Sequence, residues 1–93
     1  MSTELTGILV ACTTPFTADG SAVDYDNLQR QVDRLVEAGV GGLVPCGTTG
    51  EFTTLSEREY EDVIAAFVRA AAGRVPVCPG VGSTSTARAV ELA

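Results

Sequence analysis

The residues best suited to chemistry form a short polar turn, Gly47-Thr48-Thr49-Gly50-Glu51, directly after an apolar run. Its two glycines allow the backbone to turn tightly and to approach a ligand closely. The adjacent hydroxyls and the N–H groups around them could hold a carboxylate or a phosphate without any positive charge. The alternative is an ordinary strand-to-helix turn, in which the threonine hydroxyls bond their own backbone. The residues alone leave both interpretations open.

A second glycine-containing turn, Gly80-Val81-Gly82-Ser83, resembles half of a dinucleotide-binding fingerprint. The third glycine of that fingerprint is replaced by Ser85, and no acidic residue lies about 20 positions further on. A dinucleotide site is therefore disfavoured here.

The charged residues exclude several kinds of chemistry. The chain has 93 residues, twelve acidic and six basic, with a net charge of -6; all six bases are arginine and there is no histidine. These residues therefore supply no imidazole base, no Schiff-base lysine and no histidine metal ligand. An acidic chain without a basic cluster also predicts no nucleic-acid partner and no binding to an anionic membrane.

The cysteines Cys12, Cys46 and Cys78 are widely spaced and form no CxxC pair. They could converge on a metal, but buried cysteine usually packs as a small hydrophobe, so we expect core packing and no metal. An odd number of scattered cysteines favours a reducing cytoplasm over a secreted disulfide scaffold. No signal peptide and no apolar run of about 20 residues, as a membrane span needs, is present in these residues.

Three apolar runs recur with a period near 34 residues: 8–12, 42–46 and 75–78. Their aliphatic and β-branched composition is typical of strands buried on both faces. Helices are expected between and after them, from Asp24 to Gly39, from Ser56 to Gly73, and from about Ser85 onward. The pattern predicts an α/β fold, βαβαβα, with a parallel sheet whose strand ends bring the polar turns together.

The second expected helix opens with a capping box, Ser56 to Glu59. Helical spacing predicts a buried stripe on it, and packing is the better interpretation for both tyrosines, Tyr25 and Tyr60. The predicted stripe consists of Tyr60, Val63, Ile64, Phe67, Val68 and Ala71.

Taken in order, Thr13-Thr14-Pro15-Phe16, the turn 47–51, Leu55-Ser56-Glu57 and the turn 80–86 resemble the dihydrodipicolinate synthase and N-acetylneuraminate lyase family. The resemblance covers essentially the whole chain. It implies a (β/α)8 barrel, usually a homotetramer, that acts as a class I pyruvate aldolase without a cofactor. A barrel needs about 250 residues, so 1–93 would be the N-terminal part of one barrel domain, three of its eight βα units.

The resemblance also implies roles for the residues of the turn. Both threonines, with Gly47, would form the pyruvate-binding turn: Thr49 would hold the carboxylate with the help of neighbouring backbone N–H groups, and Thr48 would also lie in the proton-relay chain. The Schiff-base lysine and the catalytic tyrosine of the family would lie beyond residue 93, and neither Tyr25 nor Tyr60 matches that tyrosine. We therefore expect the 93 residues alone to be inactive.

The main hypothesis is a synthase that condenses pyruvate with the aldehyde aspartate semialdehyde on the way to lysine. An N-acetylneuraminate or other 2-keto-3-deoxy sugar-acid aldolase is the alternative within the family. A non-catalytic α/β module that binds a partner through an open sheet edge is the alternative from another class.

Overall fold

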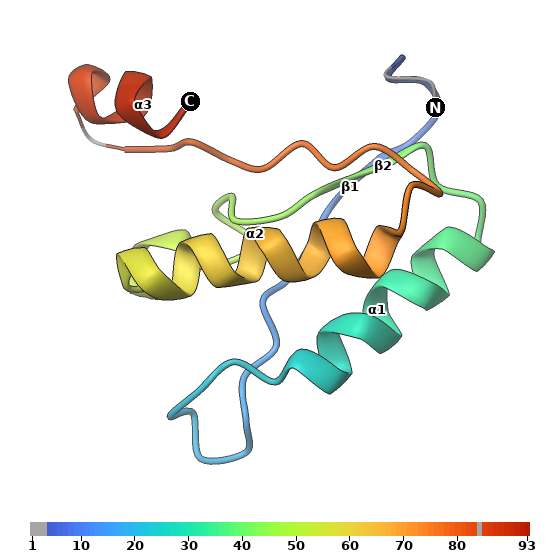
Figure 1. The fold of residues 1–93 in the computed structure, drawn as a ribbon, viewed down its shortest axis with the longest axis horizontal. Helices are drawn as coiled ribbons and strands as arrows, with labels where there is room; N and C mark the ends of the chain where they lie inside the picture. Colours follow the sequence, from blue (N-terminus) through green and yellow to red (C-terminus); the bar gives the residue numbers. More distant parts are fainter. Residues whose placement is uncertain (1–3, 84) are drawn as a thin grey trace.

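The structure, a computed structural model, describes residues 4–83 and 85–93. Two helices lie side by side along a short parallel sheet, and a third, shorter helix ends the chain (Figure 1). The elements are β1 (Leu9–Ala11), α1 (Tyr25–Glu37), β2 (Gly42–Val44), the 3-10 turn η1 (Phe52–Thr54), α2 (Glu57–Ala71) and α3 (Thr86–Leu92). The predicted α/β class and the three predicted helices are confirmed.

Within the described residues, the sheet contains two strands rather than the three that the sequence predicted. β1 and β2 are parallel, with Val10 opposite Leu43. The third apolar run lies on the other side of β2, but it pairs there through one isolated parallel bridge, Leu43 to Val77. The Leu43 N–H donates to the Pro76 carbonyl at 3.0 Å, and the Cys78 N–H donates to the Leu43 carbonyl at 2.8 Å.

Pro45 explains why this third run does not become a regular strand. In a parallel ladder, the residue two positions after Leu43 would donate the next hydrogen bond to the third run. That residue is Pro45, which has no N–H to donate. The run nevertheless continues alongside β2, because the Gly80 N–H donates to the Pro45 carbonyl at 2.8 Å.

The helix starts follow the predicted capping residues. Asp24 accepts a hydrogen bond from the Asn27 N–H, and Ser56 with Glu59 completes the capping box of α2. The end of α2 follows the prediction, since Gly73 has a left-handed φ of 76° directly after the C-cap. Ala72 already has the left-handed backbone conformation, with φ of 49°, so the helix stops before Gly73.

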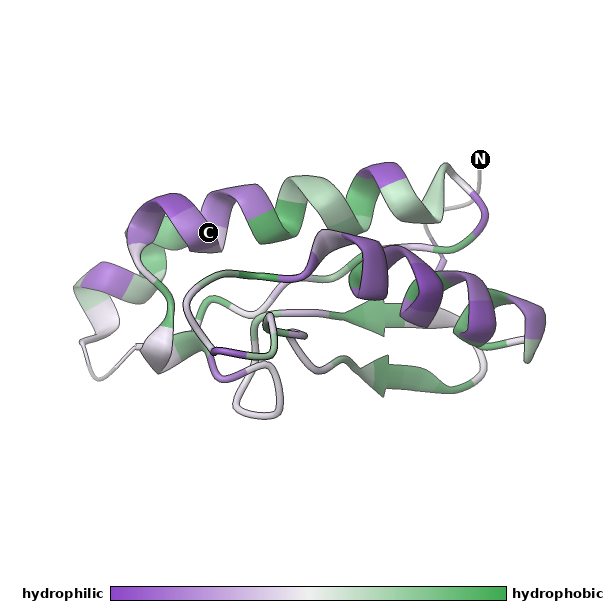
Figure 2. Cartoon of the chain, turned by 90° about the horizontal axis from the view of Figure 1, so that it is seen from below, coloured by the Kyte–Doolittle hydropathy of each residue, from purple (hydrophilic) through white to green (hydrophobic). Residues whose placement is uncertain are grey.

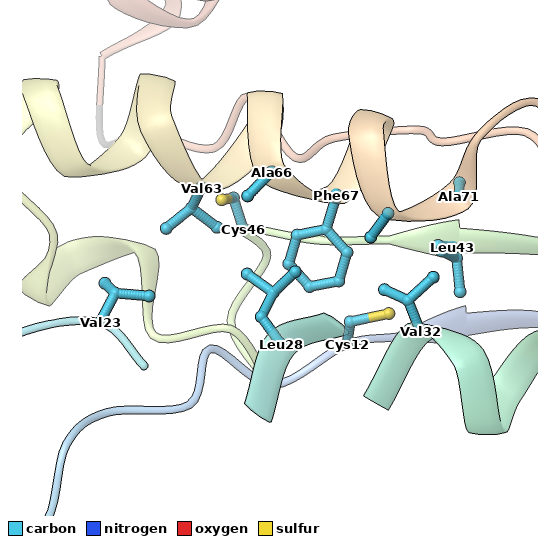
Figure 3. Packing of buried hydrophobic residues seen from close by; sticks show 11 residues of the cluster. Cys12, Val23, Leu28, Val32, Leu43, Cys46, Val63, Ala66, Phe67 and Ala71 are labelled. Carbon is cyan, nitrogen blue, oxygen red and sulfur yellow. The ribbon is translucent and has the colours of Figure 1, made fainter. Parts of the chain in front are cut away.

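The core lies between the two long helices and the sheet. Phe67 projects from α2 into a cluster that includes Leu28 of α1, Leu43 of β2 and the buried thiols Cys12 and Cys46 (Figure 3). Packing of these two cysteines as small hydrophobes is thus confirmed. On α2 the predicted stripe is wrong at one position. Val68 is 54% exposed, because it lies about 140° around the helix from the buried Val63.

The sheet is covered on one face only. α1 and α2 both lie over the same face of the two strands (Figure 2). We expected strands that are buried on both faces, but β1 is not. Leu9 at its start is 40% exposed, and Ile8, the residue before it, is 74% exposed. A membrane-spanning helix, which must be both long and strongly apolar, is not found in the part of the chain that the structure describes.

This open face predicts how the 93 residues behave on their own. Exposed aliphatic side chains beside an unpaired strand edge favour association over a stable monomer. We expect the isolated chain to form oligomers or aggregates with a broad unfolding transition, as measured by analytical ultracentrifugation and urea denaturation. A monodisperse monomer that unfolds cooperatively would contradict this expectation.

Candidate functional site

The three polar turns meet at the carboxyl ends of the strands. The Thr14 hydroxyl, from the turn after β1, donates to the Gly50 carbonyl at 2.7 Å. From the other side, the third turn approaches so closely that a Cβ on Gly80 would lie 2.6 Å from the Cys46 carbonyl oxygen. The turn 47–51 is thus held between its two neighbours, as expected for parallel strands.

The strained backbone conformations at this turn are not found at its glycines. Left-handed φ values occur at Cys46, which precedes the turn, with 60°, and at Glu51, its last residue, with 57°. A non-glycine residue in this conformation costs about 1–3 kcal/mol, which the surrounding structure must offset. Neither Gly47 nor Gly50 has a positive φ in the described structure, so the left-handed conformations of this turn are adopted by other residues.

The two glycines serve different purposes instead. A Cβ on Gly50 would lie 2.9 Å from the Cys46 nitrogen and 3.1 Å from the Cys12 carbonyl oxygen, so Gly50 permits a close backbone approach. A Cβ on Gly47 would meet nothing within 4 Å. Gly47 therefore faces open space, where a ligand could approach the backbone.

Several hydrogen-bond donors of the turn have no protein acceptor. Within the described residues, no acceptor is found for the N–H groups of Gly47, Thr48 and Thr49 or for the two threonine hydroxyls. Both threonine side chains are exposed. By contrast, Thr54 shows the ordinary turn behaviour, because its hydroxyl donates to the Glu51 carbonyl at 2.8 Å. The hydroxyls of Thr48 and Thr49 are thus not used to build the turn.

Two titratable side chains next to the turn, Cys46 and Tyr60, have a pKa above the ordinary value. Burial raises the pKa of the Cys46 thiol to about 11. Burial, and then the nearby Cys46, raises the pKa of Tyr60, with Arg88 opposing the shift. The Tyr60 hydroxyl donates to the Gly80 carbonyl. The apolar spacing of α2 predicted packing for Tyr60 but gave no signal for this bond to the third turn.

The turn 80–83 is used for packing. Gly80 contacts the Cys46 backbone, and a Cβ on Gly82 would lie 3.2 Å from the Phe52 ring. Both glycines therefore allow contact with the turn 47–51 and with η1 rather than with a pyrophosphate. Among residues 4–83 and 85–93, no cluster of three or more His, Cys, Asp or Glu side chains could hold a metal ion.

The fold and the turn define a class of protein: an α/β chain with free hydroxyl and N–H donors on a βα turn at the carboxyl ends of parallel strands. A model of the dihydrodipicolinate synthetase family matches residues 4–93. The chain belongs to the dihydrodipicolinate synthetase family.

Individual relatives agree with this family. The chain is 55% identical over 87 residues to a 4-hydroxy-tetrahydrodipicolinate synthase of Sorangium cellulosum, which covers 94% of this chain and 29% of that protein. It is 47% identical over 92 residues to the enzyme of the same name from Methanopyrus kandleri, covering 99% of this chain and 31% of that protein. The chain thus spans about 30% of the length of these curated relatives.

Solved structures show the same backbone. A dihydrodipicolinate synthase from Acinetobacter baumannii, chloride-inhibited and complexed with pyruvate, matches with a TM-score of 0.90 at 40% identity, over 96% of this chain and 30% of that one. The enzyme from Aquifex aeolicus matches with a TM-score of 0.84 at 43% identity, over 92% and 29% of the two chains.

The different surroundings of the two glycines predict different costs for adding a methyl group. In a full-length protein that contains this chain, Gly50→Ala should lower the free energy of unfolding by about 2 kcal/mol or more, because backbone atoms must move. Gly47→Ala, the matched control, should change it by less than about 1 kcal/mol. Urea denaturation of both variants checks this. Equal losses of unfolding free energy in the two variants would contradict the close backbone contacts described for Gly50.

Proposed function

We propose that this chain is part of a 4-hydroxy-tetrahydrodipicolinate synthase, which condenses pyruvate with aspartate semialdehyde, and that its turn 47–51 binds the pyruvate carboxylate. The curated relatives with 43–55% identity carry this enzyme name, which favours the synthase over a sugar-acid lyase. The proposal extends to a barrel in which 1–93 forms three βα units.

The observation that carries the proposal is the set of donors without protein acceptors. Three consecutive N–H groups, at residues 47–49, and the hydroxyls of Thr48 and Thr49 lie on one exposed turn. A carboxylate accepts several hydrogen bonds and forms stronger ones with them than a neutral acceptor does. Gly47 leaves the approach to this backbone open.

The two threonines are proposed to differ in role. Thr49, with the N–H groups around Gly47, binds the carboxylate, whereas Thr48 takes part in the hydrogen-bond chain that relays protons. Both roles rest on the resemblance of the turn to the family motif. A Schiff-base lysine and a catalytic tyrosine outside these 93 residues complete the reaction.

The proposal also includes assembly and location. By the same resemblance, the full-length enzyme is a homotetramer that works in the cytoplasm without a cofactor. The three thiols Cys12, Cys46 and Cys78 are all free, which is compatible with a reducing compartment.

Replacing each threonine by valine separates the two roles. In the full-length enzyme, Thr49→Val should raise the KM for pyruvate, because the carboxylate loses a charge-assisted hydrogen bond worth about 1.5–3 kcal/mol. Thr48→Val should lower kcat more than it raises KM, because its role is in proton transfer. Steady-state kinetics with both substrates measures both effects. Unchanged kinetics in both variants would refute the assigned roles and leave an ordinary turn.

The 93 residues alone should form no Schiff base. An imine requires an unprotonated amine, and the sequence contains no lysine, while arginine stays protonated at any working pH. Incubation with pyruvate and borohydride, followed by intact-mass measurement, should show no stoichiometric adduct. The full-length enzyme is the positive control. A stoichiometric adduct on an internal residue of this chain would contradict the proposal, whereas a trace on the N-terminal amine would not.

A further inference from the structure

We propose that Thr14 is a positioning residue for the carboxylate-binding turn, which it reaches from the neighbouring βα unit through the Gly50 carbonyl. This inference rests on the proposed function of the turn 47–51. Thr14 touches no substrate in the proposal. It acts by fixing the backbone that presents the donors of residues 47–49.

The burial of Thr14 sets it apart from the other threonines of the turns. Its side chain is 3% exposed, and it is the one fully buried polar side chain in the described part of the chain. A buried hydroxyl costs free energy unless it forms a hydrogen bond. Thr14 forms that bond over 36 positions of sequence, to the Gly50 carbonyl at 2.7 Å. The two neighbouring turns are thereby joined directly.

The peptide bond between Gly50 and Glu51 connects this contact to the site. The Gly50 carbonyl and the Glu51 N–H belong to the same planar unit, so they cannot rotate independently. On one side the carbonyl accepts from Thr14, and on the other the Glu51 N–H donates to the Thr48 carbonyl at 3.0 Å. Thr14 thus holds the peptide unit whose second bond closes the turn around Thr48 and Thr49.

The same peptide unit needs support, because Glu51 has a left-handed φ of 57°. Without an external bond, this residue could relax toward the ordinary helical or extended regions. Such a change would rotate the peptide and release the Thr48 carbonyl. A hydrogen bond from a buried, rigid neighbour opposes this relaxation.

Thr14 is itself held in place by α1. The Gln31 side-chain amide forms two hydrogen bonds with the backbone of Thr13, the residue before Thr14. It accepts from the Thr13 N–H at 3.2 Å and donates to the Thr13 carbonyl at 3.1 Å. The residue after Thr14 is proline, whose φ is fixed. Helix α1 therefore anchors the segment from which Thr14 reaches the turn.

The experiment compares three variants of the full-length enzyme. Thr14→Val removes the hydroxyl while keeping the shape, and Thr14→Ser keeps the hydroxyl. Thr54→Val is the matched control, because it removes a similar hydroxyl-to-carbonyl bond, to Glu51, that is exposed and local. Steady-state kinetics gives the KM for pyruvate and for the aldehyde separately, and thermal unfolding gives Tm.

We expect Thr14→Val to raise the KM for pyruvate about tenfold, with the KM for the aldehyde changed by less than about twofold. Thr14→Ser should restore the pyruvate KM, and Thr54→Val should leave it near the wild-type value. If Thr14→Val does not fold, Thr14→Cys, a weaker donor of similar size, should give an intermediate increase.

Two results would overturn the inference. One is a Thr14→Val enzyme, or in its place a Thr14→Cys enzyme, with the wild-type KM for pyruvate. The other is a variant whose Tm falls while both KM values change equally and serine does not rescue, since this indicates a role in stability alone. A wild-type enzyme without pyruvate-dependent activity would instead refute the proposed function, so the two failures are distinguishable.

Discussion

The backbone pairing of Leu43 on both sides of β2 is the constraint on which the rest of the structure depends. β1 pairs with β2 along one edge, and the run around Val77 bonds the Leu43 N–H and carbonyl along the other. The Leu43 side chain is fully buried against the helices. Because all three segments run parallel, their polar ends are forced to the same edge, and the contacts between turns follow from that placement.

The site is shaped by backbone contact rather than by charge. Gly50 and Gly80 bring two neighbouring turns against the backbone at Cys46, and side chains as large as a methyl group would prevent this approach. The cost of the left-handed residues Cys46 and Glu51 is offset by these contacts and by hydrogen bonds from neighbouring segments. The result is a row of backbone donors that an anion can use with no cation among the residues of the turn.

Much of the fold could be predicted from the sequence, because the signals are local. Asp24, Ser56 and Ser85 begin helices where a capping side chain is expected, and each of them caps its helix in the structure. The run 75–78 is predicted as a regular strand, but Pro45, directly after the neighbouring β2, has no N–H and so removes one hydrogen bond of the ladder between them. The candidate turn was found by its hydroxyls and glycines. The left-handed φ of Cys46 and the hydrogen bonds from Thr14 and Tyr60 depend on contacts between distant segments. The spacing of apolar residues along the sequence does not predict such contacts.

The contacts that shape the turn 47–51 all come from residues between Cys12 and Gly82. During synthesis on the ribosome, all the contact partners of this turn have therefore emerged once Gly82 has, although the uncovered sheet face still leaves them without a stable fold. At that moment the uncovered face of the sheet, including Ile8, is also exposed to solvent. The stage at which the turn first has all its contact partners thus coincides with a high risk of aggregation, because apolar surface is exposed.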